Sequence, residues 1–505
     1  MPLSNIPADR CWRTGLAVLL CTAAPCVSLP ALAQSAGDQD TRLRLDQELE
    51  GQKRKAETRL LEGADALDGP PTSLEIDGKT YSVGDNVNEM GQALYISIRR
   101  HMWRQARRFL AAYEQYPDRD PKLVLFAKGA LAREDGHLAQ AERYYRELVA
   151  LEPSLMTGQL ELARVLFENR KDREARHAFE KVRSQLVAEG DKSAGVVRTV
   201  DAFLTALKRR RGWQGKIAIG PGYSNNLNQS SASYTCLLAT DDGTCLFDRK
   251  VPDAIKGAGI NFEGTLGRSI PLSGHHGVRA SALLFGDIYP SQGDYSQATL
   301  ITRLGYQYQS AHNSLSLSPS FDIGTFGSSV LYNAWGANVD WTHTASRNIL
   351  LRAEGNYRDY RYRQRAYASQ DGPQADVSAT VFYVPSPSWN LFGGPDFAAK
   401  DTPAAVNAFR QWGGRLGVSK SFGKSASLLL LGSYRHRDYR AYSEVFAAKR
   451  RDDQYNATAI ARFPALKFLG LIPEAVVQYT SVKSNIDWLY SFKRTSASLR
   501  LSYAF

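Results

Sequence analysis

From Trp213 to Phe505, apolar and polar residues alternate over long stretches separated by turn-forming residues. In the stretch LLRAEGNYR, Leu351 and Tyr357 fall on one side of an extended chain, whereas Arg352 and Arg358 fall on the other. The stretches TLITRLGYQYQ and QYNATAIARF alternate in the same way. A period of two residues is the period of a β-strand, so this half of the chain is predicted to be a sheet with two chemically different faces.

The length and spacing of these strands favour a transmembrane β-barrel over a soluble sandwich. A sandwich would use shorter strands and turn its apolar face inward. Long strands that end in aromatic residues, with short turns alternating with longer polar loops, are typical of a barrel that is apolar towards lipid and polar towards its lumen. We count fourteen antiparallel strands, the eighth and ninth having the weakest pattern, which begin near Lys216, Ile255, Gly277, Gln297, Ser314, Leu331, Ile349, Asp376, Trp389, Phe409, Ala426, Asp453, Pro473 and Ser491.

Charged residues within the strands are predicted to line the lumen, because a charged side chain is costly on the lipid face. This set comprises Glu263, Arg303, Arg352, Glu354, Arg358, Arg415, Arg435, Arg462 and Glu474. Two interpretations stay open: a network that braces the wall, or a hydrophilic passage for a moving chain. Fourteen strands lie between small filled barrels and the larger water-filled porins, so strand number does not choose between them.

The last ten residues, SASLRLSYAF, have the pattern of a closing strand. Leu501, Tyr503 and Phe505 share one face, and the two aromatic residues are expected at the periplasmic aromatic girdle. A terminal Phe after alternating apolar residues also resembles the C-terminal signal that the barrel-insertion machinery reads.

The N-terminus predicts export from the cytoplasm. Residues 1–33 contain Arg10 and Arg13, an apolar run and the small-residue site Ala31–Ala33, so cleavage is expected before Gln34. The net charge of +12 would permit nucleic acid or an anionic surface as partner. An exported protein is not expected to bind nucleic acid, so outer-membrane lipid is the expected partner of this positive charge.

Two cysteines remain after removal of the signal peptide. Cys236 and Cys245 stand in the polar stretch TCLLATDDGTC, with a turn-forming Asp-Asp-Gly between them. In an oxidising compartment this pair is predicted to form a disulfide. A metal site would need further His or Cys ligands that the neighbouring sequence lacks, so no metal is expected.

Residues 34–212 are predicted to form a periplasmic helical domain, because apolar residues recur there at three- and four-residue spacing. Two segments repeat at an offset of 34 residues, which is the length of a tetratricopeptide helix pair. The residues expected to pack these helix pairs, and so to shape a concave face that binds a peptide or protein, are Gly129, Ala141, Tyr145, Ala163, Ala175 and Phe179. A degenerate earlier copy ends at Pro117, and a plain helical bundle is the alternative. The run Lys208–Arg211 marks the junction with the barrel.

The sequence gives no motif for catalysis. Hydrolase, metal-site and phosphate-loop patterns are absent, and His436 near Asp438 is the one candidate for a catalytic histidine. Flanking arginines make it more typical of a cluster of lumen or rim side chains. We therefore expect no enzyme activity and no cofactor.

Several stretches together resemble one family, the surface lipoprotein assembly modulators (Slam). They are the repeat region FLAAYEQYPDRDPKLVLFAKGALAREDGHLAQAERYYRELVALEPSLMTGQLELARVLFENRKDREARHAFEKV and the barrel stretches GPGYSNNLNQ, YRHRDYRAYSEVFAAKRRDDQYNATA and YTSVKSNIDWLYSFKR. They extend over nearly all of the chain beyond the signal peptide. The resemblance implies tetratricopeptide repeats and a fourteen-stranded outer-membrane barrel at residues 213–505.

The resemblance also implies a function. Slam proteins move client proteins from the periplasm to the cell surface, in a process sometimes called type XI secretion. The clients are surface lipoproteins or secreted proteins for haem and metal acquisition. The implied partners are a client, periplasmic chaperones, the barrel-insertion machinery and outer-membrane lipid, and we expect a monomer. The alternatives are an exopolysaccharide exporter, which also joins tetratricopeptide repeats to a barrel, and a passive porin.

Overall fold

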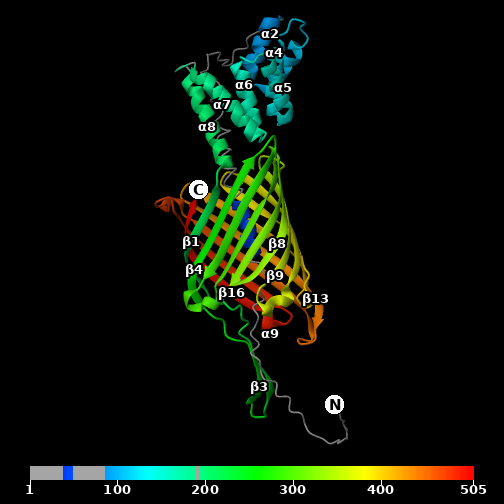
Figure 1. The fold of residues 1–505 in the computed structure, drawn as a ribbon, viewed down its shortest axis with the longest axis vertical. Helices are drawn as coiled ribbons and strands as arrows, with labels where there is room; N and C mark the ends of the chain where they lie inside the picture. Colours follow the sequence, from blue (N-terminus) through cyan, green and yellow to red (C-terminus); the bar gives the residue numbers. More distant parts are fainter. Residues whose placement is uncertain (1–37, 49–85, 189, 191–192) are drawn as a thin grey trace, which may run out of the picture.

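The computed structural model describes residues 38–48, 86–188, 190 and 193–505. It has a helical domain at one end, a β-barrel in the middle and a hairpin that projects from the other end of the barrel (Figure 1). The predicted signal peptide, with its cleavage site before Gln34, lies outside the described residues. So does the segment 49–85 that joins residues 38–48 to the helical domain.

The barrel is a closed antiparallel sheet of fourteen strands, as the alternating pattern predicted. Each strand pairs with its neighbours in sequence, and β1 pairs with both β4 and the last strand, β16. The barrel strands are β1 (Gln214–Ser224), β4 (Gly257–Pro271), β5 (His276–Ile288), β6 (Gln297–Gln309), β7 (Asn313–Phe326), β8 (Ser329–Thr344), β9 (Ile349–Tyr362), β10 (Gly372–Ser386), β11 (Trp389–Lys400), β12 (Phe409–Phe422), β13 (Ala426–Ser443), β14 (Ala448–Arg462), β15 (Ile472–Ser484) and β16 (Phe492–Ala504).

Most strands begin within a few residues of the predicted positions, and the eighth and ninth strands are present as β10 and β11. The largest difference is in β14, which begins at Ala448 rather than near Asp453, because the charged run KRRDD continues the strand instead of forming its loop. The remaining two strands, β2 (Tyr234–Ala239) and β3 (Cys245–Lys250), form a separate hairpin in the loop between β1 and β4. Cys236 and Cys245 form a disulfide within this hairpin.

The two faces of the barrel wall differ as the alternation requires. Along β9, Arg352, Glu354 and Arg358 are buried inside, while Tyr357 on the opposite face is 53% exposed. Large apolar side chains cover the outside on every part of the wall. Examples are Ile217, Ile219, Leu304, Leu317, Trp335, Val377, Val381, Phe397, Leu416, Val477, Leu499 and Leu501. This outer surface is what a barrel needs in a bilayer.

The chain closes the barrel with its last residue. Phe505 and Gly215 exchange two backbone hydrogen bonds of 3.0 Å, so the final residue completes the ladder between β1 and β16. A Cβ at position 215 would lie 2.8 Å from the Phe505 ring and 2.4 Å from the carbonyl oxygen of Thr265. Glycine is therefore required where the terminal aromatic ring crosses the start of β1.

The helical domain contains helix pairs in the predicted register. Its helices are α2 (Val87–Arg99), α3 (Trp103–Tyr113), α4 (Pro121–Glu134), α5 (Leu138–Leu151), α6 (Met156–Glu168), α7 (Asp172–Ala188) and α8 (Ala194–Arg211). The two copies offset by 34 residues are the pairs α4–α5 and α6–α7. The upstream copy is the pair α2–α3. None of the described helices is long and apolar enough to cross a membrane.

An aromatic ring against a small residue holds the pairs α2–α3 and α4–α5 together. The Tyr145 ring on α5 covers Gly129 on α4 so closely that a Cβ there would lie 2.7 Å from it. Tyr113 on α3 covers Gly91 on α2 in the same way. In the second copy the equivalent aromatic residue, Phe179, stacks on Phe203 of α8 with ring centroids 4.9 Å apart. The helix α8 thus ends the repeat stack by covering the last aromatic position.

The helix α8 also connects the helical domain to the barrel. Within the basic run Lys208–Arg211, Arg210 packs on the ring of Phe167 and pairs with Asp172, so it belongs to the core of the repeat domain. Arg268 on β4 donates a hydrogen bond of 3.1 Å to the carbonyl oxygen of Arg211. β1 begins three residues after α8 ends.

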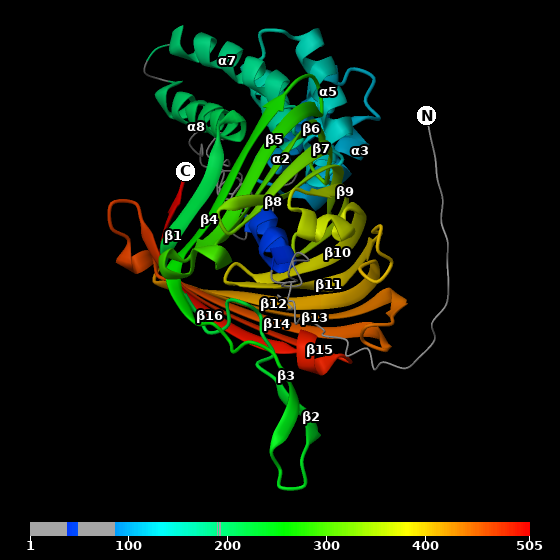
Figure 2. The same cartoon turned by 60° about the horizontal axis from the view of Figure 1, so that its bottom comes forward.

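Residues 38–48 do not lie with the helical domain. They form a helix inside the barrel, which we call the lumen helix (Figure 2, the blue helix enclosed by the strands). The predicted helical domain at 34–212 is therefore divided in the structure: residues 38–48 belong spatially to the barrel, and the described helical domain begins with α2. The separation follows from the helix's contacts with the wall, which are described below.

The repeat packing makes a testable prediction at Tyr145. Replacing Tyr145 with Ala removes the ring that covers Gly129 and should lower the free energy of unfolding of the helical domain by about 3–5 kcal/mol. Thermal unfolding of the full chain in detergent, followed by helical circular dichroism, measures the loss. Tyr145→Phe is the control: the second repeat carries Phe at this position, so this variant should unfold close to the unmodified protein. Equal losses in both variants would contradict the packing role of the ring.

Candidate functional site

The lumen helix has the sequence DQDTRLRLDQE, in which six of eleven residues are charged. Acidic and basic side chains point around the whole helix, and Leu43 and Leu45 are its only large apolar residues. A helix that is polar on all sides has no apolar face to bury in a helical bundle. A polar lumen, by contrast, supplies partners in every direction.

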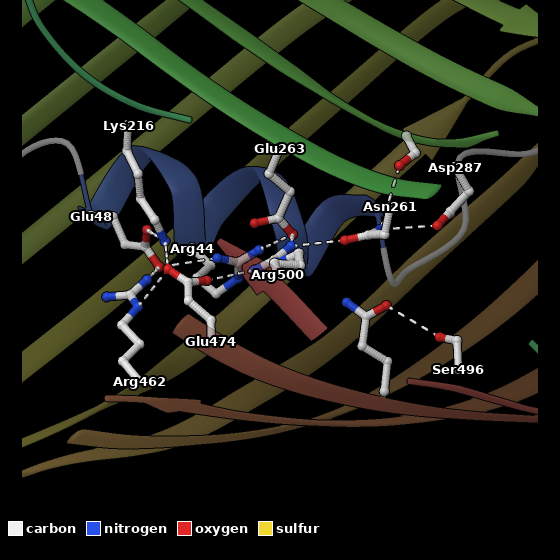
Figure 3. Close-up of polar contacts among 12 residues, drawn as sticks. Arg44, Glu48, Lys216, Asn261, Glu263, Asp287, Arg462, Glu474, Ser496 and Arg500 are labelled. Carbon is white, nitrogen blue, oxygen red and sulfur yellow. Dashed lines mark hydrogen bonds and ion pairs between the residues drawn. The ribbon is translucent and has the colours of Figure 1, made fainter. Parts of the chain in front are cut away.

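One end of the helix is held by charged side chains from three strands, β1, β4 and β14 (Figure 3). Glu48 receives hydrogen bonds from Arg462 on β14 at 2.6 Å and from Lys216 on β1 at 3.3 Å. Arg44, one turn earlier, pairs with Glu48 at 3.0 Å and with Glu263 on β4 at 2.5 Å. These side chains are largely removed from solvent, which strengthens the attraction between opposite charges.

Two further ion pairs fix the helix to the neighbouring wall. Asp46 accepts hydrogen bonds from Arg303 on β6 at 3.1 and 3.2 Å. Arg42 pairs with Asp322 on β7 at 3.5 Å. Next to these pairs, Leu45 joins a small apolar cluster with Leu283, Phe285 and Ile301, which are inward-facing residues of β5 and β6.

The other end of the helix contacts the opposite wall. Asp40 accepts hydrogen bonds from Arg435 and from Ser433, both on β13, at 2.6 Å each. Gln39 contacts Gln411 on β12 at 3.4 Å. The helix therefore spans the lumen from β1 and β4 to β12 and β13, and it is bonded on both sides.

Each wall side chain that bonds the lumen helix also has a polar partner on the wall itself. Glu474 on β15 pairs with Lys216 at 2.7 Å and with Arg462 at 3.3 Å. The other wall contacts are Glu263 with Arg500 (2.9 Å), Arg303 with Glu354 (3.6 Å), Asp322 with Arg358 (3.6 Å), Arg435 with Asp396 (2.8 Å), Ser433 with Arg435 (3.2 Å) and Gln411 with Arg437 (2.8 Å). The wall network therefore includes pairs that do not run through the helix.

The nine predicted lumen charges all lie on the inner wall and belong to this network. Glu263, Arg303, Arg435 and Arg462 contact the lumen helix directly. The other five, which are Arg352, Glu354, Arg358, Arg415 and Glu474, pair with wall residues. Their partners were not predicted to line the lumen, although all of them follow the same strand alternation: Lys216, Asp322, Asp340, Asp376, Asp396 and Arg500.

The six predicted repeat residues are all buried between helices. Gly129, Ala141, Tyr145, Ala163, Ala175 and Phe179 form the contacts of the helix pairs and present no exposed surface. They shape the domain and do not themselves form a surface for a partner. At the other end of the chain, Leu501, Tyr503 and Phe505 are 45–47% exposed on the outer face of the barrel.

His436 lies away from the lumen. It is on the outward face of β13, where its Nδ1 lies 2.8 Å from Asp453 and its ring is 5.5 Å from that of Trp412. Asp438 lies 3.5 Å from its Nε2. The histidine therefore belongs to a polar and aromatic cluster on the outside of the barrel, not to the network that holds the lumen helix.

Two family descriptions match the chain. Residues 213–505 match the family described as surface lipoprotein assembly modifier, and residues 79–179 match its N-terminal TPR repeats. A hemophilin secretion modulator from Acinetobacter baumannii is 34% identical over 503 residues, which cover 96% of this chain and 99% of the relative. Surface lipoprotein assembly modifier 2 from Haemophilus influenzae is 28% identical over 387 residues, covering 74% and 76%. Among solved structures, the outer membrane channel DcaP of Acinetobacter baumannii aligns with a TM-score of 0.34 and 12% identity, over 58% of this chain and 96% of its own.

The fold and these matches define an outer-membrane β-barrel protein with a tetratricopeptide domain in the periplasm. More particularly, the chain belongs to the surface lipoprotein assembly modifier family. The family matches confirm the resemblance to the Slam family that the sequence showed. The helical domain is periplasmic, the C-terminus lies at the same end of the barrel, and the β2–β3 hairpin projects from the opposite end (Figure 1).

The buried ion pairs of the lumen predict unequal effects of two arginine substitutions on β13. Arg435→Met leaves the carboxylates of Asp396 and Asp40 without their closest cation and should destabilise the barrel by about 3–5 kcal/mol. Arg440→Met removes a half-exposed partner of Asp401 and should cost less than about 1 kcal/mol. The temperature at which the folded band converts to the unfolded band on SDS gels measures both. Equal temperatures would show that the buried pairs do not stabilise the barrel.

Proposed function

We propose that this protein moves client proteins from the periplasm to the cell surface. The observation that carries the proposal is a closed barrel with a polar inner wall, joined directly to a periplasmic repeat domain. The names of its relatives, which are surface lipoprotein assembly modifiers and a hemophilin secretion modulator, support surface lipoproteins or secreted haem- and metal-acquisition proteins as clients. Such a client would pass from the repeats to the barrel.

The two parts of the chain have complementary tasks in this proposal. Repeat stacks present extended surfaces to peptides and proteins, and here the stack is fixed next to the barrel through α8. A client held there is present at a high effective concentration at the entrance of the barrel. The chain carries no nucleotide-binding motif, so we propose that folding of the client outside the cell drives the transfer, with no catalysis by this protein.

The lumen helix favours a translocator over a passive porin. A porin for small solutes needs a permanently open bore, whereas here a charged helix crosses the bore and bonds both sides. The exopolysaccharide exporter is less favoured, because the described helical domain contains only three helix pairs and α8. We propose that the protein acts as a monomer, with periplasmic chaperones and the barrel-insertion machinery as further partners.

A deletion within the helical domain tests the capture role of the repeats. Removing residues 86–205 keeps the lumen helix and the barrel but removes the proposed client-binding stack. We expect a barrel that still inserts in the outer membrane and a severalfold loss of client at the cell surface, since transfer then depends on chance encounter. Co-expression with a candidate lipoprotein or haem-binding client, followed by protease shaving of whole cells, measures the loss. Undiminished display would refute a capture role.

We also propose that Leu501, Tyr503 and Phe505 form the C-terminal signal for barrel insertion. The support is their common position on the outer face of the closing strand, with Phe505 at its end. Phe505→Ala should lower the amount of folded protein in the outer membrane severalfold, because the terminal ring is lost while the backbone ladder can still form. Leu499→Ala, on the same face of β16, is the matched control and should insert normally. The heat-resistant folded fraction on gels of isolated outer membranes gives the comparison.

A further inference from the structure

We infer that the lumen helix, residues 38–48, is a gate that leaves its position when a client passes. This inference rests on the proposed function and adds the regulation of the same passage. In the structure the helix crosses the bore, so a polypeptide could not pass beside it without displacing its contacts with β1, β4, β13 and β14. A transport route through the lumen therefore requires the helix to move.

Departure of the helix would break one of at least two polar contacts made by each wall group that bonds it, and not the last one. Each wall group that bonds the helix keeps a wall partner: Glu474 for Lys216 and Arg462, and Asp396 for Arg435. Glu263 likewise keeps Arg500. Breaking a buried ion pair is strongly destabilising mainly when one charge is left unpaired. This duplication makes release of the helix less costly than the loss of isolated buried pairs would be.

The helix itself is also suited to release. Its four acidic residues and two arginines give it a net charge of −2, that is, two minus four. The contacted wall charges are Lys216, Arg303, Arg435 and Arg462 against Glu263 and Asp322, which gives +2. This complementarity holds the helix in place through contacts that water can replace. Only Leu43 and Leu45 lose apolar burial when it leaves.

The position of the helix in the chain links the gate to the repeats. Residues 38–48 precede the helical domain, and residues 49–85 join them to it covalently. The helix is therefore retained by the protein after it leaves the bore.

The first experiment measures the bore directly. The full chain and a variant lacking residues 38–48 are purified and inserted into planar bilayers in KCl. We expect a severalfold higher mean conductance for the deletion variant, and an intermediate rise for the variant Asp46→Asn with Glu48→Gln, which weakens the helix contacts. Asp201→Asn with Glu180→Gln, which neutralises two exposed acids of the helical domain, is the charge-matched control and should conduct like the unmodified protein. Unchanged conductance on deletion of the helix would overturn the inference.

A second experiment locks the gate without removing it. Asp40 and Ser433 are hydrogen-bonded at 2.6 Å, so Asp40→Cys with Ser433→Cys places two thiols within reach of a short bifunctional thiosulfonate. Cross-linked cells should lose display of the co-expressed client, and reduction of the cross-link should restore it. Each single-cysteine variant, treated identically, should retain display. Normal display by the cross-linked protein would show that transfer does not require release of the helix.

The two experiments separate the gate from the proposed function. The unlocked protein could fail to display a client while deletion of the helix still raises the conductance. In that case the helix closes the bore, but the protein is not a client translocator. If the unlocked protein displays its client and the lock has no effect, the translocator stands and the gate fails. If the variant lacking residues 38–48 does not fold, as judged by its heat-resistant band on gels, the helix is a structural support and the inference is wrong.

Discussion

The structure depends on one constraint: within the bilayer, the backbone must satisfy its hydrogen bonds without water. A closed sheet does so because every strand has two neighbours, and here the ladder continues to the last residue, where Phe505 bonds Gly215. Closure also separates two environments. Apolar residues on one side of each strand meet lipid, and the charged residues between them have no place except the lumen.

Charges gathered in a narrow lumen must then be paired, and this requirement explains the network on the inner wall. Arg435 and Arg500 are fully buried, yet each bonds two carboxylates. The lumen helix enters the same network from the inside and shares its partners. The duplication of contacts at Glu474, Asp396 and Arg500 makes movement of a charged helix compatible with a stable barrel.

Sequence reasoning succeeded where a local period encodes the environment. Alternation located the fourteen strands and the inward charges, and an offset of 34 residues located the helix pairs and their buried aromatic residues Tyr145 and Phe179. It placed the start of β14 near Asp453, too late in the chain, because the charged residues before Asp453 already belong to the strand. It also failed at residues 38–48, which were assigned to the helical domain because they have helical character.

The sequence by itself determined the two-part architecture and the two faces of the barrel wall, because periods of two and of 3.6 residues record which face of an element meets which medium. Only the tertiary structure decided where the lumen helix lies and which charges pair. Asp40 and Arg435 are 395 residues apart in the chain. No local pattern specifies such a pair, since Coulomb attraction depends on distance in space and not on separation along the chain.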